Sequence, residues 1–377
     1  MKVTISAHFV EKGKVGGAEH MLYNLVKGLI ECNVDINILC NSKLQFDEEF
    51  VINVSKHVKF FELNQFNHRF ITEQLSCIKF GKELKSDVIL FPNYYTPLWV
   101  PKSLGKVCTV IHDFQYRHFP QYFSNKKRLA LYLAHYFTCK RADKVILISE
   151  HAKSDVEKFY NTAVLKKVEV IPNPISWERF EVGLASISRN FEGVNYLLCV
   201  AAQYPHKNVK TIIHAFKDIS QQFPNLKLVL VGQVSDELVG IDSNKQVNLK
   251  KIIGGMSLTT KVIITGYLDN ASLGWLYQNA KLFLFPSVFE GFGMPPVEAL
   301  GFGVPTITTK CASIPEVTHG FATYVNNPMD SNEWAAKITH ILQNESDSAV
   351  KKEDSLQLKS FYDPKVIANK YLLALAD

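Results

Sequence analysis

Apolar positions follow two different periods along this chain. Short apolar runs of strand length alternate with longer amphipathic segments, and this alternation predicts an α/β fold with parallel sheets covered by helices. The strand-like runs of the first half are VTISAHFV, VDINILC, VKFFEL, DVILFP, KVCTVIH, KVILIS and VEVIP. A second round consists of NYLLCVAA, LKLVLVG, KVIITG, LFLFPS, PTITT and ATYVN.

The segment VIPNPISWERF separates the two rounds. Its Asn173-Pro174 step favours an extended or turning backbone, so we interpret the segment as an interdomain hinge. A chain of 377 residues is also long for a single core. We therefore expect two doubly wound domains, at residues 1–173 and 174–361.

One stretch of the second round, residues 281–305, carries the densest chemical signal. The run LFLF is a buried strand that Pro286 ends, because proline cannot donate to a strand ladder. Pro295 and Pro296 suit the first turn of a following helix. A helix N-terminus offers free N–H groups and a positive dipole end, which suit an anion such as a diphosphate.

Two glutamates frame this loop. Glu290 precedes a Gly-Phe-Gly turn, and Glu298 is expected in the first helical turn. Carboxylates accept hydrogen bonds from vicinal hydroxyls and stabilise positive charge at an anomeric carbon. Alternatively, Glu298 is an acid favoured only by the helix dipole and Glu290 is a solvated loop residue.

The sequence E-G-F-G-M-P-P-V-E-A, followed by G-x-P, resembles the signature loop of the retaining family-4 glycosyltransferases. The resemblance implies the GT-B fold, two Rossmann-like domains that face a central cleft, with residues 362–377 packing back on the first domain. It implies that Glu290 contacts the donor sugar and Glu298 the nucleotide ribose. Backbone amides that would contact the sugar and diphosphate belong to Gly291, Phe292, Gly293 and Met294.

Two further segments match this family. In KGKVGGAEH, Gly17 would lie near the ligand, although the segment lacks a dinucleotide fingerprint and is alternatively a flexible connection. Lys207 of the segment H-K-N matches the family's lysine and would neutralise the diphosphate. Ala201-Ala202 replaces the Gly-Arg that often precedes it, so no arginine supplements Lys207 there.

A His-Asp pair ends the strand-like run KVCTVIH, where open α/β sheets place ligands. His112 is either a structural hydrogen-bonding residue or, as the resemblance implies, the histidine beside the donor sugar. Asp113 and, more weakly, His118 are candidates on the acceptor side. No metal-ligand spacing such as D-x-D or H-E-x-x-H occurs, so we expect a metal-independent enzyme.

Composition sets broad limits on the partners. Hydrophobic residues at 47% and charged residues at 21% are typical of a globular protein, and the net charge of +6 is too diffuse for a nucleic-acid partner. Seven cysteines without a C-x-x-C pair favour a reducing compartment, so a cytoplasmic location is expected. The segment NKKRLALYLAHYFTCKRADK is basic at both ends and aromatic between them. It either covers a sheet or lies on the anionic inner face of a membrane.

We therefore expect a glycosyltransferase that uses a nucleotide sugar, GDP-mannose first and a UDP-sugar second, and a glycan or lipid-linked acceptor. Resemblance to bacterial mannosyltransferases of surface polysaccharide synthesis supports this expectation. The alternatives are another GT-B activity, such as a nucleotide-sugar epimerase or hydrolase, and a non-catalytic sugar-binding protein.

Overall fold

The computed structural model divides the chain into two compact units. The first comprises residues Met1–Pro120, Ser124–Ser176 and Phe361–Asp377, and the second comprises Gln121–Phe123 and Trp177–Ser360. The main boundary therefore falls inside the proline-containing segment VIPNPISWERF. The structure describes residues 1–13, 16–64, 66, 68–181, 187–202, 204–232, 248–344 and 349–376.

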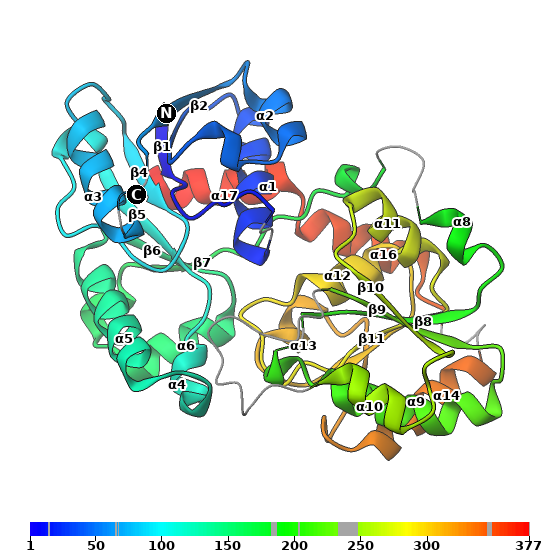
Figure 1. Cartoon of the computed structure of the whole chain (residues 1–377). Coiled ribbons are helices and arrows are strands. Elements are labelled where there is room, and N and C mark those ends of the chain that lie inside the picture. Colours follow the sequence, from blue (N-terminus) through cyan, green and yellow to red (C-terminus); the bar gives the residue numbers. More distant parts are fainter. Residues whose placement is uncertain are drawn as a thin grey trace. The chain divides into compact units, whose positions relative to one another are not determined.

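A seven-stranded parallel sheet forms the centre of the first unit, in the order β3-β2-β1-β4-β5-β6-β7 (Figure 1). The sheet is buried on both faces, which explains why its inner strands are mainly apolar. Buried polar residues such as Thr4 in β1 and Asn37 in β2 interrupt them. Its strands are β1 (Lys2–Ser6), β2 (Asp35–Cys40), β3 (Val58–Glu62), β4 (Val88–Phe91), β5 (Lys106–Ile111), β6 (Lys144–Leu147) and β7 (Val168–Val170).

Helices connect these strands. The α-helices are α1 (Gly17–Glu31), α2 (Glu48–Val54), α3 (Arg69–Phe80), α4 (Gln115–His118), α5 (Asn125–Arg141), α6 (Glu150–Phe159), α7 (Thr162–Leu165) and α17 (Pro364–Ala376). Short 3-10 turns are η1 (Lys43–Gln45), η2 (Lys102–Leu104) and η3 (Pro120–Tyr122).

The last helix, α17, belongs to the first unit and packs on α1 (Figure 1). The two helices approach so closely at Gly28 that a Cβ atom there would lie 2.0 Å from the carbonyl oxygen of Pro364. The chain before the boundary joins this contact, because Asn24 Nδ2 donates to the carbonyl of Pro174 over 2.8 Å. Both ends of the chain therefore complete one core.

The second unit contains a six-stranded parallel sheet in the order β10-β9-β8-β11-β12-β13 (Figure 1). Two parallel sheets, each connected by helices, confirm the predicted α/β fold class of two Rossmann-like domains. The strands are β8 (Tyr196–Val200), β9 (Lys227–Val231), β10 (Val262–Gly266), β11 (Leu282–Phe285), β12 (Thr306–Thr309) and β13 (Thr323–Val325).

Helices also connect the strands of the second unit, and one of them, α14, carries the fully buried Trp334. The α-helices are α8 (Ser188–Phe191), α9 (Val209–Gln222), α10 (Leu249–Gly255), α11 (Asn270–Asn279), α12 (Met294–Gly301), α13 (Ile314–Val317), α14 (Ser331–Gln343) and α16 (Lys352–Phe361), and the 3-10 turns are η4 (Glu178–Phe180) and η5 (Pro205–Lys207).

Sheet order explains where polar side chains gather. Strands β8 and β11 are parallel neighbours, so the segments that follow them emerge at the same edge of the sheet. The segment after β8 leads to Lys207, and the loop after β11 carries Glu290. Open α/β sheets bind ligands at this carboxyl edge.

Candidate active site

The loop after β11 is held in place by hydrogen bonds from both sides. The N–H of Val288 donates to the carbonyl of His206 over 2.8 Å, which joins the loop to η5. The hydroxyl of Ser313 donates to the carbonyls of Glu290 and Phe292, each over 2.9 Å. The loop backbone is therefore positioned before any ligand binds.

An ion pair joins the two segments at the sheet edge. Lys207 Nζ lies 2.6 Å from Glu290 Oε1, and the two side chains are only 20% and 11% exposed. The next residue, Asn208, adopts a left-handed backbone with φ of 50° and donates to the carbonyls of Pro286 and Pro328. This turn directs Lys207 toward the loop after β11.

His206 precedes this lysine but adds no second positive charge. Burial and the neighbouring Lys207 lower the pKa of His206 to about 3, so its imidazole is neutral near pH 7. Of this pair, only the lysine carries a charge that attracts an anion.

Helix α12 begins directly after the Gly-Phe-Gly turn. Its N-cap, Gly293, has φ of 93°, which favours glycine, and prolines occupy the first turn as predicted. Since Pro295 and Pro296 have no N–H group, few amides remain at this helix end. Those of Gly293 and Met294 are the ones the sequence resemblance assigns to the donor.

Glu298 does not lie where the sequence suggested. The helix begins at Met294, so Glu298 lies beyond the first turn, and it is only 4% exposed. Its Oε1 accepts a hydrogen bond from Arg179 Nη2, and its Oε2 accepts one from the Tyr277 hydroxyl over 2.9 Å. Burial and this carboxylate raise the pKa of Tyr277 well above its usual value.

The two signature glutamates thus have different partners in this structure. Glu290 pairs with Lys207, whereas Glu298 pairs with Arg179. The sequence analysis missed Arg179 and Tyr277. In SWERF, Arg179 is adjacent to Phe180 and two positions from Trp177, and a cation close to aromatic residues was the available signal for a buried partner.

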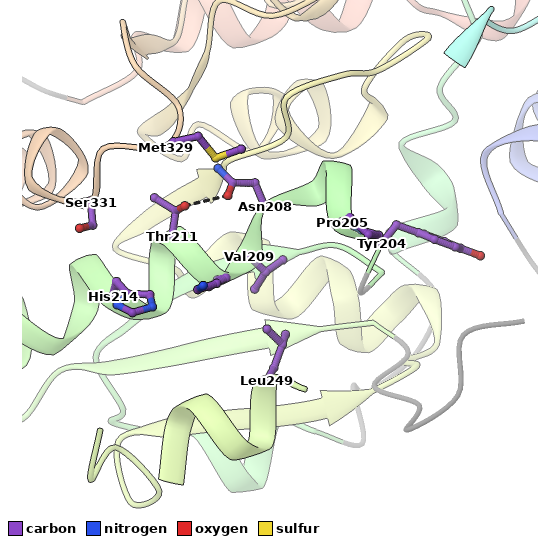
Figure 2. Close-up of a pocket in the computed structure, with 10 residues that line it drawn as sticks. Tyr204, Pro205, Asn208, Val209, Thr211, His214, Leu249, Met329 and Ser331 are labelled. Atoms are coloured by element: carbon purple, nitrogen blue, oxygen red, sulfur yellow. Dashed lines mark hydrogen bonds between the residues drawn. The ribbon is translucent and has the colours of Figure 1, made fainter. Parts of the chain in front are cut away.

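A cavity of about 470 Å³ opens beside the start of α9, and its lining includes Tyr204, Asn208 and His214 (Figure 2). Met329 and Ser331 line it from the segment that leads into α14. Lys207 and Glu290 are not among its lining residues, so we assign no role to it in the ion-pair site.

The His-Asp pair of the first unit follows β5, at the carboxyl edge of that sheet. His112 is buried, and its Nε2 lies 2.8 Å from the carbonyl oxygen of Pro92. Burial lowers the pKa of His112. Asp113 accepts from the N–H of Gln115 over 2.8 Å and from the Tyr94 hydroxyl over 3.3 Å.

Two other sequence candidates lie in the first unit. His118 ends α4, and its Nε2 lies 2.7 Å from Asp155 Oδ2. The sequence had indicated that Gly17 belongs to the loop before α1, but Gly17 is the first residue of α1. A Cβ atom at Gly17 would meet nothing within 4 Å, so its surroundings are open. Lys14 and Val15 of the same segment lie outside the described residues.

Two family models match the chain, one for each half. The model described as "Glycosyltransferase Family 4" matches residues 15–179. The model described as "Glycosyl transferases group 1" matches residues 185–357. Together they extend over the site residues named above and over every strand of the two sheets except β1.

Curated relatives that resemble the chain include two O-antigen enzymes. The O-antigen chain mannosyltransferase RfbU of Salmonella typhimurium is 28% identical over 266 residues, which are 71% of this chain and 67% of that protein. The O-antigen chain mannosyltransferase B of Escherichia coli is 23% identical over 269 residues, 70% of this chain and 68% of that protein.

Solved structures with the same fold cover almost the whole chain. Sucrose-phosphate synthase from Thermosynechococcus elongatus has a TM-score of 0.77 at 18% identity and covers 99% of this chain and 97% of its own. Anabaena HepE in complex with UDP and glucose has a TM-score of 0.74 at 20% identity and covers 100% of this chain and 99% of its own. At these identities the likeness establishes the fold.

Proposed function

Because this chain belongs to the glycosyltransferases, with its first half matched by the family 4 model and its second half by the group 1 model, we propose that it transfers mannose from GDP-mannose. The acceptor is a glycan or lipid-linked glycan of cell-surface polysaccharide synthesis. The names of the O-antigen relatives support both choices. A UDP-sugar is the second candidate donor, since HepE was solved with UDP and glucose.

The observation that carries this proposal is the ion pair at the carboxyl edge of the second sheet. Lys207 and Glu290 are 2.6 Å apart, and both side chains are largely buried. A diphosphate recruits the ammonium of Lys207, and this frees the Glu290 carboxylate to face the sugar. There the carboxylate stabilises the positive charge that develops at the anomeric carbon.

We further propose retention of the anomeric configuration by substitution on one face of the sugar. The bond between the anomeric carbon and the diphosphate oxygen breaks while the acceptor oxygen bonds to that carbon. The acceptor proton passes to the departing diphosphate. Lys207 and the amides near Met294 stabilise the negative charge of the leaving group, so this step needs no metal ion.

The proposed function is tested by donor binding followed by product analysis. GDP and GDP-mannose should raise the Tm more than UDP or ADP at equal concentration; a ligand at 100 times its Kd adds about 2.7 kcal/mol. In the product analysis, mannosyl transfer should be detected only when an extract that contains the acceptor glycan is added.

Other outcomes would identify the alternatives. Release of free mannose regardless of acceptor would indicate a hydrolase, and an altered nucleotide sugar would indicate an epimerase. Binding without turnover over a broad acceptor panel would leave a sugar-binding protein.

We also propose that α5 docks on the inner face of the cytoplasmic membrane. Five apolar or aromatic side chains of α5 are more than two-fifths exposed, and basic residues occupy both helix ends. The exposed set, called here the α5 apolar face, is Leu129, Tyr132, Leu133, Tyr136 and Phe137. Apolar side chains between basic groups suit an anionic lipid surface. In the part of the chain that the structure describes, no helix meets the length and hydropathy of a membrane span.

Changing the α5 apolar face should weaken vesicle binding. The double variant Leu133→Glu/Phe137→Glu places two carboxylates against anionic headgroups and should lower the partition coefficient for phosphatidylglycerol vesicles by about tenfold, or 1.4 kcal/mol. Cosedimentation measures it. Leu356→Glu, at an exposed position of α16, is the matched control. Equal binding of all three proteins would contradict the proposal.

A further inference from the structure

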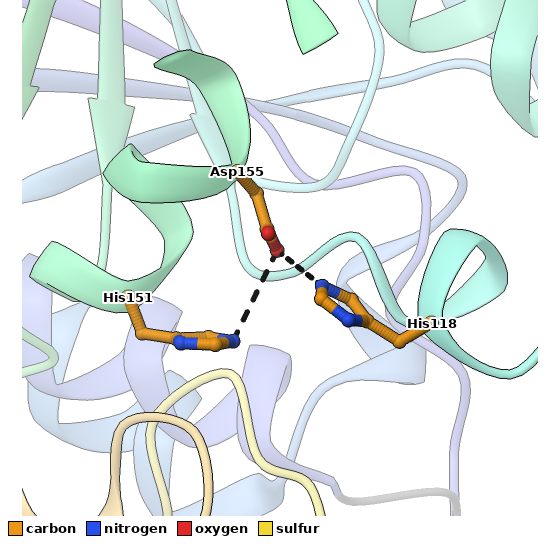
Figure 3. A group of neighbouring side chains, drawn as sticks. All are labelled: His118, His151 and Asp155. Atoms are coloured by element: carbon orange, nitrogen blue, oxygen red, sulfur yellow. Dashed lines mark hydrogen bonds and ion pairs between the residues drawn. The ribbon is translucent and has the colours of Figure 1, made fainter. Parts of the chain in front are cut away.

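Three side chains of the first unit converge in a cluster that the proposed transfer step does not use, although one of them, His118, is also the weaker acceptor-side candidate. His118, His151 and Asp155 place one ligand atom each within 4.8 Å of one another (Figure 3). Asp155 Oδ2 is the common point, 2.7 Å from His118 Nε2 and 4.0 Å from His151 Nε2. In Figure 3 the two imidazoles approach this carboxylate from different elements.

The fold explains the convergence. His151 and Asp155 lie four positions apart on α6, so they share one face of the helix. His118 ends α4. Helices α4 and α6 follow β5 and β6, which are parallel neighbours, so both begin at the same sheet edge. Ligands of open α/β sheets bind at this edge.

The spacing is close to that of a tetrahedral metal centre. Metal–nitrogen and metal–oxygen bonds of about 2.0–2.1 Å place neighbouring ligand atoms about 3.3 Å apart. The observed distances of 2.7 and 4.0 Å lie on either side of this value. Small rotations of the two imidazoles therefore suffice to surround an ion.

Charge and burial also suit a cation. Asp155 is fully buried, and its second oxygen, Oδ1, lies 3.9 Å from the exposed ammonium of Lys158. The Oδ2 atom is left facing the two imidazoles. The His118 side chain is 29% exposed, so an ion has a path from solvent.

We propose that His118, His151 and Asp155 form a binding site for a zinc-like divalent transition-metal ion. Two imidazoles and one carboxylate are ligands typical of zinc, and three protein ligands leave a fourth position for water. The site belongs to the first unit alone. Lys207 and Glu290, to which the transfer chemistry is assigned, belong to the second unit.

Metal titration of the full chain tests this site. Protein stripped with a chelator should bind one equivalent of Co²⁺, with visible absorption bands typical of tetrahedral coordination, and Zn²⁺ should displace it. Removing a group that hydrogen-bonds to a metal ligand typically lowers the metal affinity about 10–100-fold. Removing a ligand itself, as in His118→Gln or His151→Gln, should lower the affinity at least as much. Zn²⁺ should raise the Tm of the wild type but not of these variants.

The controls separate this site from other metal-binding groups. His57→Gln changes an exposed histidine elsewhere in the first unit and should bind Co²⁺ as the wild type does. His118→Gln alters a partly exposed ring and is expected to fold, which the unchanged circular dichroism spectrum would verify. The absence of Co²⁺ bands in the wild type, or equal affinity in His118→Gln and His57→Gln, would overturn the proposal.

Discussion

Glu290→Gln is expected to lower kcat by about 10²–10³-fold, which corresponds to about 2.7–4 kcal/mol of lost transition-state stabilisation. The substitution keeps the shape of the side chain and removes its charge. It therefore removes the negative charge that we propose stabilises the positive charge developing at the anomeric carbon. Single-turnover kinetics with labelled donor measure the chemical step directly.

The same substitution should not weaken donor binding. In the free protein Glu290 Oε1 lies 2.6 Å from Lys207 Nζ, so the carboxylate competes with a diphosphate for the ammonium. Removing the carboxylate charge should leave the Kd for GDP unchanged or make it smaller. Lys207→Ala should raise that Kd, because it removes the cation itself.

Glu353→Gln, at an exposed position of α16, is the matched control and should retain wild-type kinetics. If Glu290→Gln keeps kcat within about tenfold, a loss below about 1.4 kcal/mol, the role proposed for Glu290 is wrong. A higher Kd for GDP in Glu290→Gln would show that the carboxylate acts on binding rather than on the chemical step.

Arg179→Met is expected to lower the free energy of unfolding of the second unit by about 3–5 kcal/mol. The Arg179 and Glu298 side chains are 11% and 5% exposed. The substitution leaves the carboxylate buried without the Arg179 cation, while the neutral Tyr277 hydroxyl still donates a hydrogen bond to it. Urea unfolding followed by circular dichroism measures the loss.

The double variant Arg179→Met/Glu298→Met separates pairing from packing. Replacing a buried ion pair by apolar residues of similar volume is often nearly neutral, so the double variant should recover most of the stability lost in Arg179→Met. A loss below about 1 kcal/mol in Arg179→Met would mean that the pair contributes no more than a surface salt bridge.

The same variants address the role of Glu298. The resemblance assigns this carboxylate to the nucleotide ribose, and that assignment stays a prediction. Since Glu298 already accepts from Arg179 and Tyr277, a ribose hydroxyl would have to share its oxygens. An unchanged Kd for GDP in Glu298→Gln would assign the residue to the fold alone.

The fold was predictable because local patterns determine it. The run LFLF and the VILF within DVILFP are apolar at every position, as is typical of strands buried on both faces. They became β4 and β11 with ends shifted by a few residues at most. The proline pair at positions 295 and 296 likewise placed the start of α12, because proline is tolerated in a first helical turn.

Contacts between distant residues were not predictable in the same way. The partners of Lys207–Glu290 are 83 positions apart, and those of Arg179–Glu298 are 119 apart. The family resemblance named Lys207, Glu290 and Glu298 as ligand-binding residues, but it predicted neither ion pair. Arg179 was not named at all. His151 and Asp155 were missed although their spacing on a helix is a local signal. The third residue of the cluster, His118, lies near them only because β5 and β6 are neighbours in the sheet.

The close contact between α1 and α17 has a consequence for biosynthesis. A ribosome produces the chain from its N-terminus, so residues 177–360 emerge before α17, the helix that packs against Gly28 of α1. The second unit can therefore finish folding first, although it comes later in the sequence. Until α17 is made, the first unit lacks one of its helices, and the side of α1 that packs on α17 stays uncovered.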